Sequence, residues 1–207
     1  MSTQTAMPIP GIKKSKSIVA NTNGEPTLIT STTSNYTWIW SDVGSGSDKD
    51  CTVFRPAPTV TGFYIVGDYA QGNYSGPSGT SLIVMAVNED PHNPLLSKPS
   101  DYVQVWNDKG SHGDHDGAIW RPVAPDGYLA LGCVANGGYG KPDIDNYRCV
   151  RKDLVTDSLA GNLIWSDKGS HADEDVSLYQ LTDVGGAFVA QGNYDPYVGP
   201  AYKLVNN

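Results

Sequence analysis

Three short acidic segments hold the side chains best suited to chemistry. They are WSDVGSGSDKD (residues 40–50), WNDKGSHGDHD (106–116) and WSDKGSHADED (165–175), which align without a gap. Trp, Asp, Gly, Ser and two further Asp residues recur at the same offsets in all three segments. Carboxylates this close repel one another unless a cation or backbone N–H groups compensate. Calcium binds several oxygen ligands in such loops. The pattern therefore predicts calcium ligands, namely Asp42, Asp48, Asp50, Asp108, Asp114, Asp116, Asp167, Asp173 and Asp175.

The same aspartates have a second interpretation as turn residues. Asp in a Gly-Ser turn commonly accepts backbone N–H bonds and shapes the loop. The spacing also differs from that of the EF-hand calcium loop. His112 and His171 share one offset and His115 lies nearby, so zinc is a further alternative. The sequence leaves metal binding and turn structure both open.

A second motif follows each acidic segment. It reads YAQGNY (69–74), VANGGY (134–139) and VAQGNY (189–194). Amide groups and a ring beside carboxylates are typical of sugar recognition, because the amides bind hydroxyls and the ring covers the apolar face of a pyranose. The other interpretation is a turn tyrosine that packs over the glycine. The candidate ligand-binding residues are Asn73, Tyr74, Tyr139, Asn193 and Tyr194.

The elements that position these motifs are predicted to be short strands. In the first repeat they cover 36–40, 51–55, 63–69 and 82–87, rich in Val, Ile, Tyr and Trp and bounded by Gly, Pro, Asn and Asp. No 3.6-residue apolar period is present, so we expect very little helix. Three such repeats predict an all-β, three-fold pseudosymmetric β-prism of three four-stranded antiparallel sheets, with a small propeller or barrel as the alternative.

Within a meander, the first and third turns lie at one end of the sheet. Both motifs of each repeat are therefore expected at the same end, and the Arg55-Pro56 and Arg121-Pro122 segments at the opposite end. Trp40, Trp106 and Trp165 end their first strands at equivalent positions, which predicts core packing beneath the acidic loops.

Together these motifs resemble the vacuolar protein sorting-associated protein 62 family. The resemblance rests on Trp-x-Asp-x-Gly-Ser, then Arg-Pro, then Gly-Tyr-x-x-Leu-Gly, and covers about residues 36 to 205. The third repeat has lost the Arg-Pro pair. The resemblance implies a β-prism, and similar modules occur at the C-terminus of some perforin-like toxins, where they are thought to bind target membranes.

Composition narrows the classes of function. The chain has 22 Asp and Glu against 14 Lys and Arg, which argues against nucleic-acid binding. No nucleophile or acid–base motif is visible and every candidate carboxylate is triplicated, so we expect no enzyme. The three cysteines lack C-x-x-C spacing and are expected to be reduced. No apolar run suggests a signal peptide or a membrane span. We therefore expect a cytoplasmic protein or one released without a signal peptide.

We divide the chain into a polar tail at 1–24 and a single domain at 25–207, with repeats at about 36–87, 102–151 and 163–205. The predicted function is a non-catalytic, lectin-like module that recognises glycans or glycolipids on a cell surface, with calcium as its one candidate cofactor. Two alternatives remain open. One is a membrane-lipid-targeting component of a pore-forming toxin or trafficking complex, and the other is a structural protein without a small ligand. The sequence does not give the oligomeric state.

Overall fold

The computed structural model describes residues 24–205. The predicted tail, except for Gly24, lies outside the described residues. The described chain is almost entirely strand and loop, and its one helical element is the 3-10 turn η1 (Lys152–Leu154). The expectation of very little helix is confirmed. Within residues 24–205 no helix is both long and apolar enough to cross a membrane.

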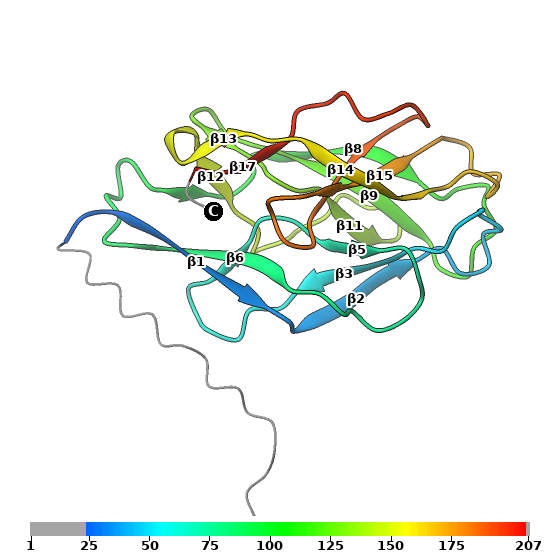
Figure 1. Cartoon of the computed structure of the whole chain (residues 1–207), viewed down its shortest axis with the longest axis horizontal. Coiled ribbons are helices and arrows are strands. Elements are labelled where there is room, and N and C mark those ends of the chain that lie inside the picture. The colour runs from blue at the N-terminus through cyan, green and yellow to red at the C-terminus, as the bar shows by residue number, and fades with distance from the viewer. Residues whose placement is uncertain (1–23, 206–207) are drawn as a thin grey trace, which may run out of the picture.

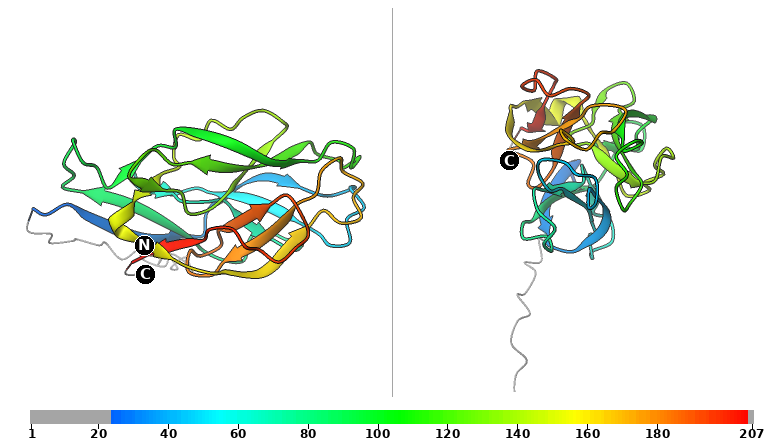
Figure 2. Two further views of the ribbon diagram at one scale, coloured as in Figure 1. Left: turned by 90° about the horizontal axis from the view of Figure 1, so that it is seen from above. Right: turned by 90° about the vertical axis from the view of Figure 1, so that its right-hand side faces the viewer.

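Each repeat forms one antiparallel three-stranded sheet around its acidic loop. The sheets are β2–β3–β5, β8–β9–β11 and β14–β15–β16. Their strands are β2 (Tyr36–Ser41), β3 (Thr52–Pro56), β5 (Tyr69–Gln71), β8 (Asp101–Asn107), β9 (Gly117–Val123), β11 (Val134–Gly137), β14 (Ala160–Ser166), β15 (Ser177–Leu181) and β16 (Phe188–Gln191). Figure 2 shows the three repeats gathered side by side when the molecule is viewed along its long axis.

A second set of sheets forms the other half of the elongated molecule (Figure 1). These sheets are β1–β6–β4, β10–β12–β7 and β13–β17. Their strands are β1 (Thr27–Thr33), β4 (Tyr64–Ile65), β6 (Ser81–Val87), β7 (Leu96–Ser97), β10 (Tyr128–Leu129), β12 (Cys149–Arg151), β13 (Val155–Asp157) and β17 (Tyr202–Leu204).

The predicted four-stranded sheets are therefore not formed, because the strands of each repeat divide between two smaller sheets. The fourth strand of the first repeat, β6, pairs with β1 and β4 and not with β2, β3 and β5. The structure also adds a strand ahead of each repeat (β1, β7 and β13). No sheet in the described residues closes into a barrel.

The division occurs where the three repeats meet at Gly67, Gly132 and Ala187, a region called the waist. A Cβ added at Gly67 would lie 3.0 Å from both the Gly132 Cα and the Ala187 Cβ. Only the smallest residues fit such a close approach of backbones. Hydrogen bonds cross between repeats here, from Gly132 N to Val66 O (2.8 Å) and from Cys133 N to Phe188 O (2.8 Å). The predicted strand 63–69 therefore breaks at this point into β4 and β5.

Beyond the waist, three tryptophans form the centre of the loop half. Trp40, Trp106 and Trp165 are at most 1% exposed, and their ring centroids are 5.5–5.6 Å apart in edge-to-face contacts. A register shift precedes each tryptophan in its strand pair. A β-bulge of this kind re-aims a side chain, and here it turns the indole towards the other two. The predicted core packing of these tryptophans is confirmed.

Candidate functional site

The indoles connect each repeat to the acidic loop of the next. Trp165 Nε1 donates to the Lys49 carbonyl (2.9 Å), and Trp106 Nε1 donates to the Glu174 carbonyl (2.8 Å). Trp40 Nε1 donates to the His115 carbonyl (2.9 Å), which completes the cycle. The three acceptors occupy one offset in their loops. Each acidic loop is thus anchored by a hydrogen bond to a buried tryptophan of the neighbouring repeat.

The first aspartate of each loop is buried in this network. Asp42, Asp108 and Asp167 are at most 4% exposed. Asp42 accepts the backbone N–H of Cys51 (2.7 Å) and the indole of Trp165 (2.9 Å). Asp167 repeats this pattern with Val176 (2.8 Å) and Trp106 (3.1 Å). Burial raises the pKa of all three carboxyls, although these hydrogen bonds oppose the shift. The geometry favours loop shaping for Asp42 and Asp167, whereas the buried Oδ1 of Asp108 has no hydrogen-bond partner among the described residues.

The second aspartate of each loop lies against the adjacent loop. The backbone N–H groups of Asp48, Asp114 and Asp173 donate to carbonyls of Lys168, Val43 and Lys109, each at 2.8 Å. Their carboxylates lie over Gly169, Gly44 and Gly110, where an added Cβ would be 2.6–3.0 Å from a carboxylate oxygen. These glycines have φ of 83–94°, so both conformation and space require glycine. The three loops interlock in a ring at the end of the molecule.

His112 and His171 occupy a left-handed turn position in this ring. Their φ values are 57° and 60°, and Gly46 at the same offset in the first repeat has a φ of 78°. Both imidazoles are exposed. The two histidines offered as zinc ligands therefore lie in solvent-exposed turns of the second and third loops.

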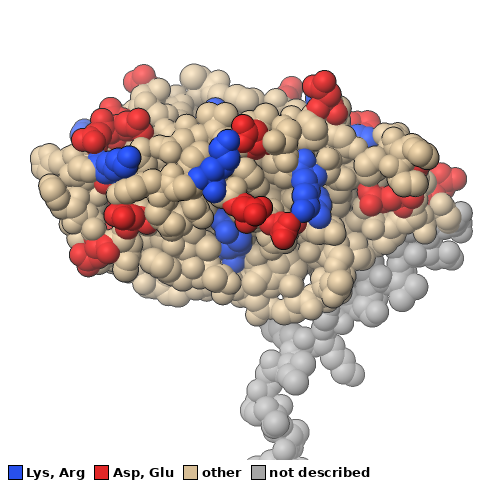
Figure 3. All heavy atoms as spheres, turned by 180° about the vertical axis from the view of Figure 1, so that it is seen from behind, with Lys and Arg blue, Asp and Glu red and all other residues tan. Residues whose placement is uncertain are grey.

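The outer carboxylates remain at the surface. Asp48, Asp50, Asp114, Asp116, Asp173 and Asp175 are all exposed. Within residues 24–205, no group of three or more His, Cys, Asp or Glu side chains is arranged to hold a metal ion. Figure 3 shows acidic side chains at both ends of one face of the molecule, and acidic and basic side chains interspersed across its middle. Of the nine aspartates predicted as metal ligands, three are thus buried and six are exposed.

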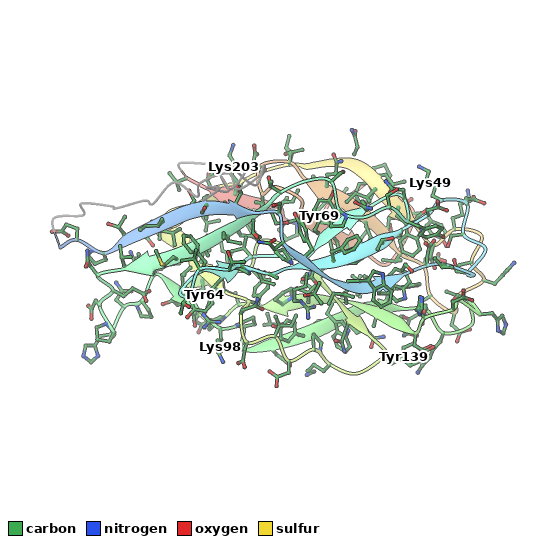
Figure 4. The ribbon with its side chains drawn as sticks, turned by 90° about the horizontal axis from the view of Figure 1, so that it is seen from below. Lys49, Tyr64, Tyr69, Lys98, Tyr139 and Lys203 are labelled. Carbon is green, nitrogen blue, oxygen red and sulfur yellow. The ribbon has the colours of Figure 1, made fainter. Side chains whose placement is uncertain are left out.

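The second motif lies beside these carboxylates, as the meander argument predicts. Tyr139 Oη donates to Asp116 Oδ1 (2.9 Å). Tyr74 contacts Asp42 and Asp50, and Tyr194 contacts Asp167 and Asp175, in the same arrangement. Desolvation and the adjacent carboxylates raise the pKa of each of these phenols well above its ordinary range. Figure 4 shows Tyr139 and Lys49 of an acidic loop at the same end of the molecule.

The tyrosines also present their rings to solvent. Tyr74 is 47% exposed and Tyr194 is 42% exposed. The Lys109 ammonium lies 4.9 Å from the ring centroid of Tyr139. Each repeat therefore places a partly open ring next to an exposed aspartate.

The asparagines predicted as ligand contacts shape these loops through one atom. Asn73 Oδ1 accepts Gln71 Nε2 (2.8 Å) and the backbone N–H of Ser75 (2.9 Å). Asn193 Oδ1 makes the corresponding bonds to Gln191 (2.8 Å) and Asp195 (3.0 Å). Among the described residues, no hydrogen bond involves Nδ2 of either asparagine. Two of the three loops therefore offer an amide donor beside the tyrosine.

Sequence reasoning missed the residues that hold the second motif in place. Gly72, Gly137 and Gly192 face the carbonyls of Ile164, Ile39 and Val105, so that an added Cβ would lie 3.2–3.6 Å from each oxygen. These carbonyls belong to the residues at the β-bulges, each in a neighbouring repeat. The invariant glycine of the motif was the available signal, since a glycine at one repeated position indicates close backbone approach.

A buried ion pair was also missed. Asp68 is fully buried and accepts Arg55 Nε (3.0 Å) and Nη2 (2.9 Å) together with the backbone N–H of Ala135 (2.9 Å). Arg55 Nη2 also donates to the Ala135 carbonyl (2.6 Å). The pair joins the first repeat to the second at the far end of β3. Nothing in the sequence pairs Asp68 with Arg55, because the other repeats have no acidic residue at the position of Asp68.

The comparisons with known proteins identify the family of the chain. The family model described as vacuolar protein sorting-associated protein 62 matches residues 3–193, which include all three acidic loops. The chain belongs to the vacuolar protein sorting-associated protein 62 family. The resemblance drawn from the Trp-x-Asp-x-Gly-Ser and Arg-Pro motifs is thereby confirmed. No curated protein matches the chain.

A solved structure similar to this member of the vacuolar protein sorting-associated protein 62 family is the crystal structure of GNIP1Aa from Chromobacterium piscinae. The two share 32% sequence identity with a TM-score of 0.71. The match covers 82% of this chain and 34% of the GNIP1Aa chain. This chain therefore spans about a third of the length of that protein.

Proposed function

We propose that the chain is a non-catalytic binding module that recognises glycans or glycolipids through the loop end of the molecule. The observation that carries this proposal is the triplicate site: each repeat places a tyrosine beside an exposed aspartate on a rigid loop. Three equivalent sites at one end would give avidity on a multivalent surface. We further propose that the three-fold packing around the tryptophans is a variant of the β-prism.

The chemistry of each site suits a sugar. The exposed ring faces of Tyr74 and Tyr194 can cover the apolar face of a pyranose. The free oxygens of Asp50 and Asp175 would accept hydrogen bonds from vicinal hydroxyls. The Nδ2 groups of Asn73 and Asn193 would donate to ring or hydroxyl oxygens. The second repeat has Gly138 at the asparagine position, so its site would bind more weakly.

A catalytic role fits this arrangement poorly. Each loop presents the same carboxylates, and those of Asp42 and Asp167 are committed to hydrogen bonds in the core. An acid–base pair needs two carboxyl groups whose environments differ, within a site that shelters the reaction. The exposed aspartates share one environment, which supports binding over catalysis.

The test is a glycan array probed with the purified protein in calcium and again in EDTA. The first variant is Asp50→Asn, Asp116→Asn and Asp175→Asn combined, which removes three exposed charges and keeps the shape of each side chain. The matched control is Asp126→Asn, because Asp126 is exposed on the loop between β9 and β10. Far-UV circular dichroism confirms that each variant is folded.

The proposal predicts array binding that the triple variant lowers about tenfold or more and that Asp126→Asn leaves unchanged. Loss of binding in EDTA would assign calcium to the exposed aspartates, whereas binding in both buffers would leave them as direct sugar contacts. A blank array in both buffers, or a folded triple variant with full binding, would overturn the glycan proposal.

A second candidate function is lipid targeting for a larger assembly. The observation that favours it is that the similar region makes up 34% of the GNIP1Aa chain, as expected for a module within a longer protein. Liposomes containing anionic lipid, with and without calcium, separate this function from sugar binding because free sugars would not compete. A protein that binds neither glycans nor liposomes would leave the third interpretation, a structural or interaction protein.

A further inference from the structure

The second and third repeats line a small open pocket beside the waist. Its volume is about 160 Å³, and its lining includes Arg121, Pro122, Cys133, Tyr197 and Tyr202. The remaining lining residues are Ala, Leu, Gly, Val and Pro, with no acidic side chain among them. Arg121 is thus the only charged group in an otherwise apolar and aromatic lining.

The first repeat shows what normally neutralises an arginine at this position. Arg55 is the equivalent of Arg121, and it forms a bidentate pair with the buried carboxylate of Asp68. Both arginines also donate to an alanine carbonyl of the next repeat, Arg55 to Ala135 (2.6 Å) and Arg121 to Ala190 (2.8 Å). The two guanidinium groups therefore share this carbonyl acceptor, although Arg121 is exposed and Arg55 is partly buried.

The counterion is missing in the second repeat. The residue equivalent to Asp68 is Cys133, which is buried and contacts both Arg121 and the backbone N–H of Ala190. No acidic side chain of the described residues forms an ion pair with Arg121. The third repeat has lost both charges, since Gln180 and Phe188 occupy the two positions. Only the second repeat keeps the arginine without the paired aspartate. The pocket lies beside this arginine.

We propose that this pocket binds a small carboxylate with a flat or short apolar tail, whose charge replaces that of Asp68. The planar guanidinium suits a carboxylate, with which it forms paired hydrogen bonds. The Tyr and Pro walls would cover the apolar part of the ligand. A phosphate dianion fits less well, because one arginine among apolar walls leaves most of its oxygens without donors. The pocket is also below the roughly 300 Å³ typical of sites for drug-sized ligands.

The probe is sodium benzoate, titrated into ¹⁵N-labelled protein and followed by chemical shifts. A ligand of this size is expected to bind at about 1 mM. Shifts should concentrate on pocket residues such as Cys133, Val189 and Tyr197. Benzamide, which has the same shape without the charge, should bind about tenfold more weakly.

Two variants copy the other repeats into this position. Arg121→Gln introduces the residue of the third repeat, and Cys133→Asp introduces the carboxylate of the first, with the Ala190 N–H and Arg121 available as its donors. Both should abolish the benzoate shifts, while the control Lys152→Gln should retain them. Lys152 is an exposed cation on η1 that does not line the pocket. The amide spectrum of each variant reports whether it is folded.

Absence of benzoate shifts at the pocket would overturn the proposal. So would retained binding in either folded pocket variant, or equal affinity for benzamide. The loop-end glycan sites are untouched by these variants, so the two proposals can fail independently.

Discussion

Replacing one of the three central tryptophans is the most direct test of how the repeats are joined. Trp165 is fully buried and makes edge-to-face contacts with Trp40 and Trp106, each at a centroid distance of 5.6 Å. Its indole also donates to the Lys49 carbonyl and to Asp42, both at 2.9 Å. Trp165→Ala removes the ring and leaves two buried acceptors without this donor.

The expected cost follows from these contacts. Replacing a buried aromatic side chain with alanine costs about 3–5 kcal/mol through lost burial and the remaining cavity. The two lost aromatic contacts together add about 1 kcal/mol to this cost, and the two unsatisfied acceptors together add about 1 kcal/mol more. We therefore expect Trp165→Ala to lower the free energy of unfolding by about 5–7 kcal/mol. A domain of ordinary stability, about 5–15 kcal/mol, would lose much of its folded population.

The assay is urea unfolding followed by far-UV circular dichroism, with Trp165→Phe as an intermediate variant that retains a ring. Trp38→Ala is the matched control, because Trp38 lies in the first strand of its repeat but is 47% exposed. It should cost about 1 kcal/mol. If Trp165→Ala costs no more than Trp38→Ala, the tryptophan contacts do not join the repeats and the reasoning fails.

Three further perturbations test other parts of the fold. Asp68→Ala leaves the partly buried Arg55 unpaired and should cost about 3–5 kcal/mol in urea unfolding; a cost below about 1 kcal/mol would contradict a structural ion pair. Burial raises the pKa of Asp42 above its ordinary 3.8, so its contribution to stability is full below that pH and is lost as pH rises through the folded value. Asp42→Asn should therefore gain stability relative to the parent as the pH rises from below 3.8 through the raised folded pKa of Asp42, and a constant difference would refute the shift. Gly132→Ala should cost about 1–3 kcal/mol at the crowded waist, whereas Gly140→Ala, which has open space around it, should be neutral in the same assay.

Local features of the fold were predictable because they depend on the types of neighbouring residues in the sequence. The predicted strand at 36–40 corresponds to β2 at Tyr36–Ser41, and the predicted strand at 82–87 to β6 at Ser81–Val87. The repeated tryptophan position predicted burial because a large apolar side chain before a polar loop has to face the core. These predictions depend on neighbours within the sequence, and the structure confirms them.

The partition into two sets of sheets was not predictable, because it depends on contacts between repeats. Gly67 lies inside the strand predicted at 63–69, although Gly67 and Gly132 mark the place where three backbones meet. β1 (Thr27–Thr33) is rich in β-branched residues, as strands commonly are, but no repeated motif pointed to it. Strand pairing across distant segments is set by packing that a single sequence does not display.

The candidate site was predictable to the same extent. The motif spacing placed Tyr139 and Asp116 at one end, as their hydrogen bond shows. It could not show that Asp42 is buried while Asp50 is exposed, because both lie in the same Gly-Ser loop. That difference comes from Trp165, a residue of another repeat, which closes over Asp42.

The pattern of identity among the repeats separates structure from recognition. Residues shared by all three repeats, such as Trp165 and Asp42, are those that contact a neighbouring repeat and hold the ring together. A ligand that binds one site in preference to another has to contact side chains that differ between the repeats. Asn73 against Gly138 is such a position at the loop end, and Asp68 against Cys133 is such a position at the waist. Specificity is therefore expected to change with substitutions at these positions, whereas substitutions at the shared positions should change stability first.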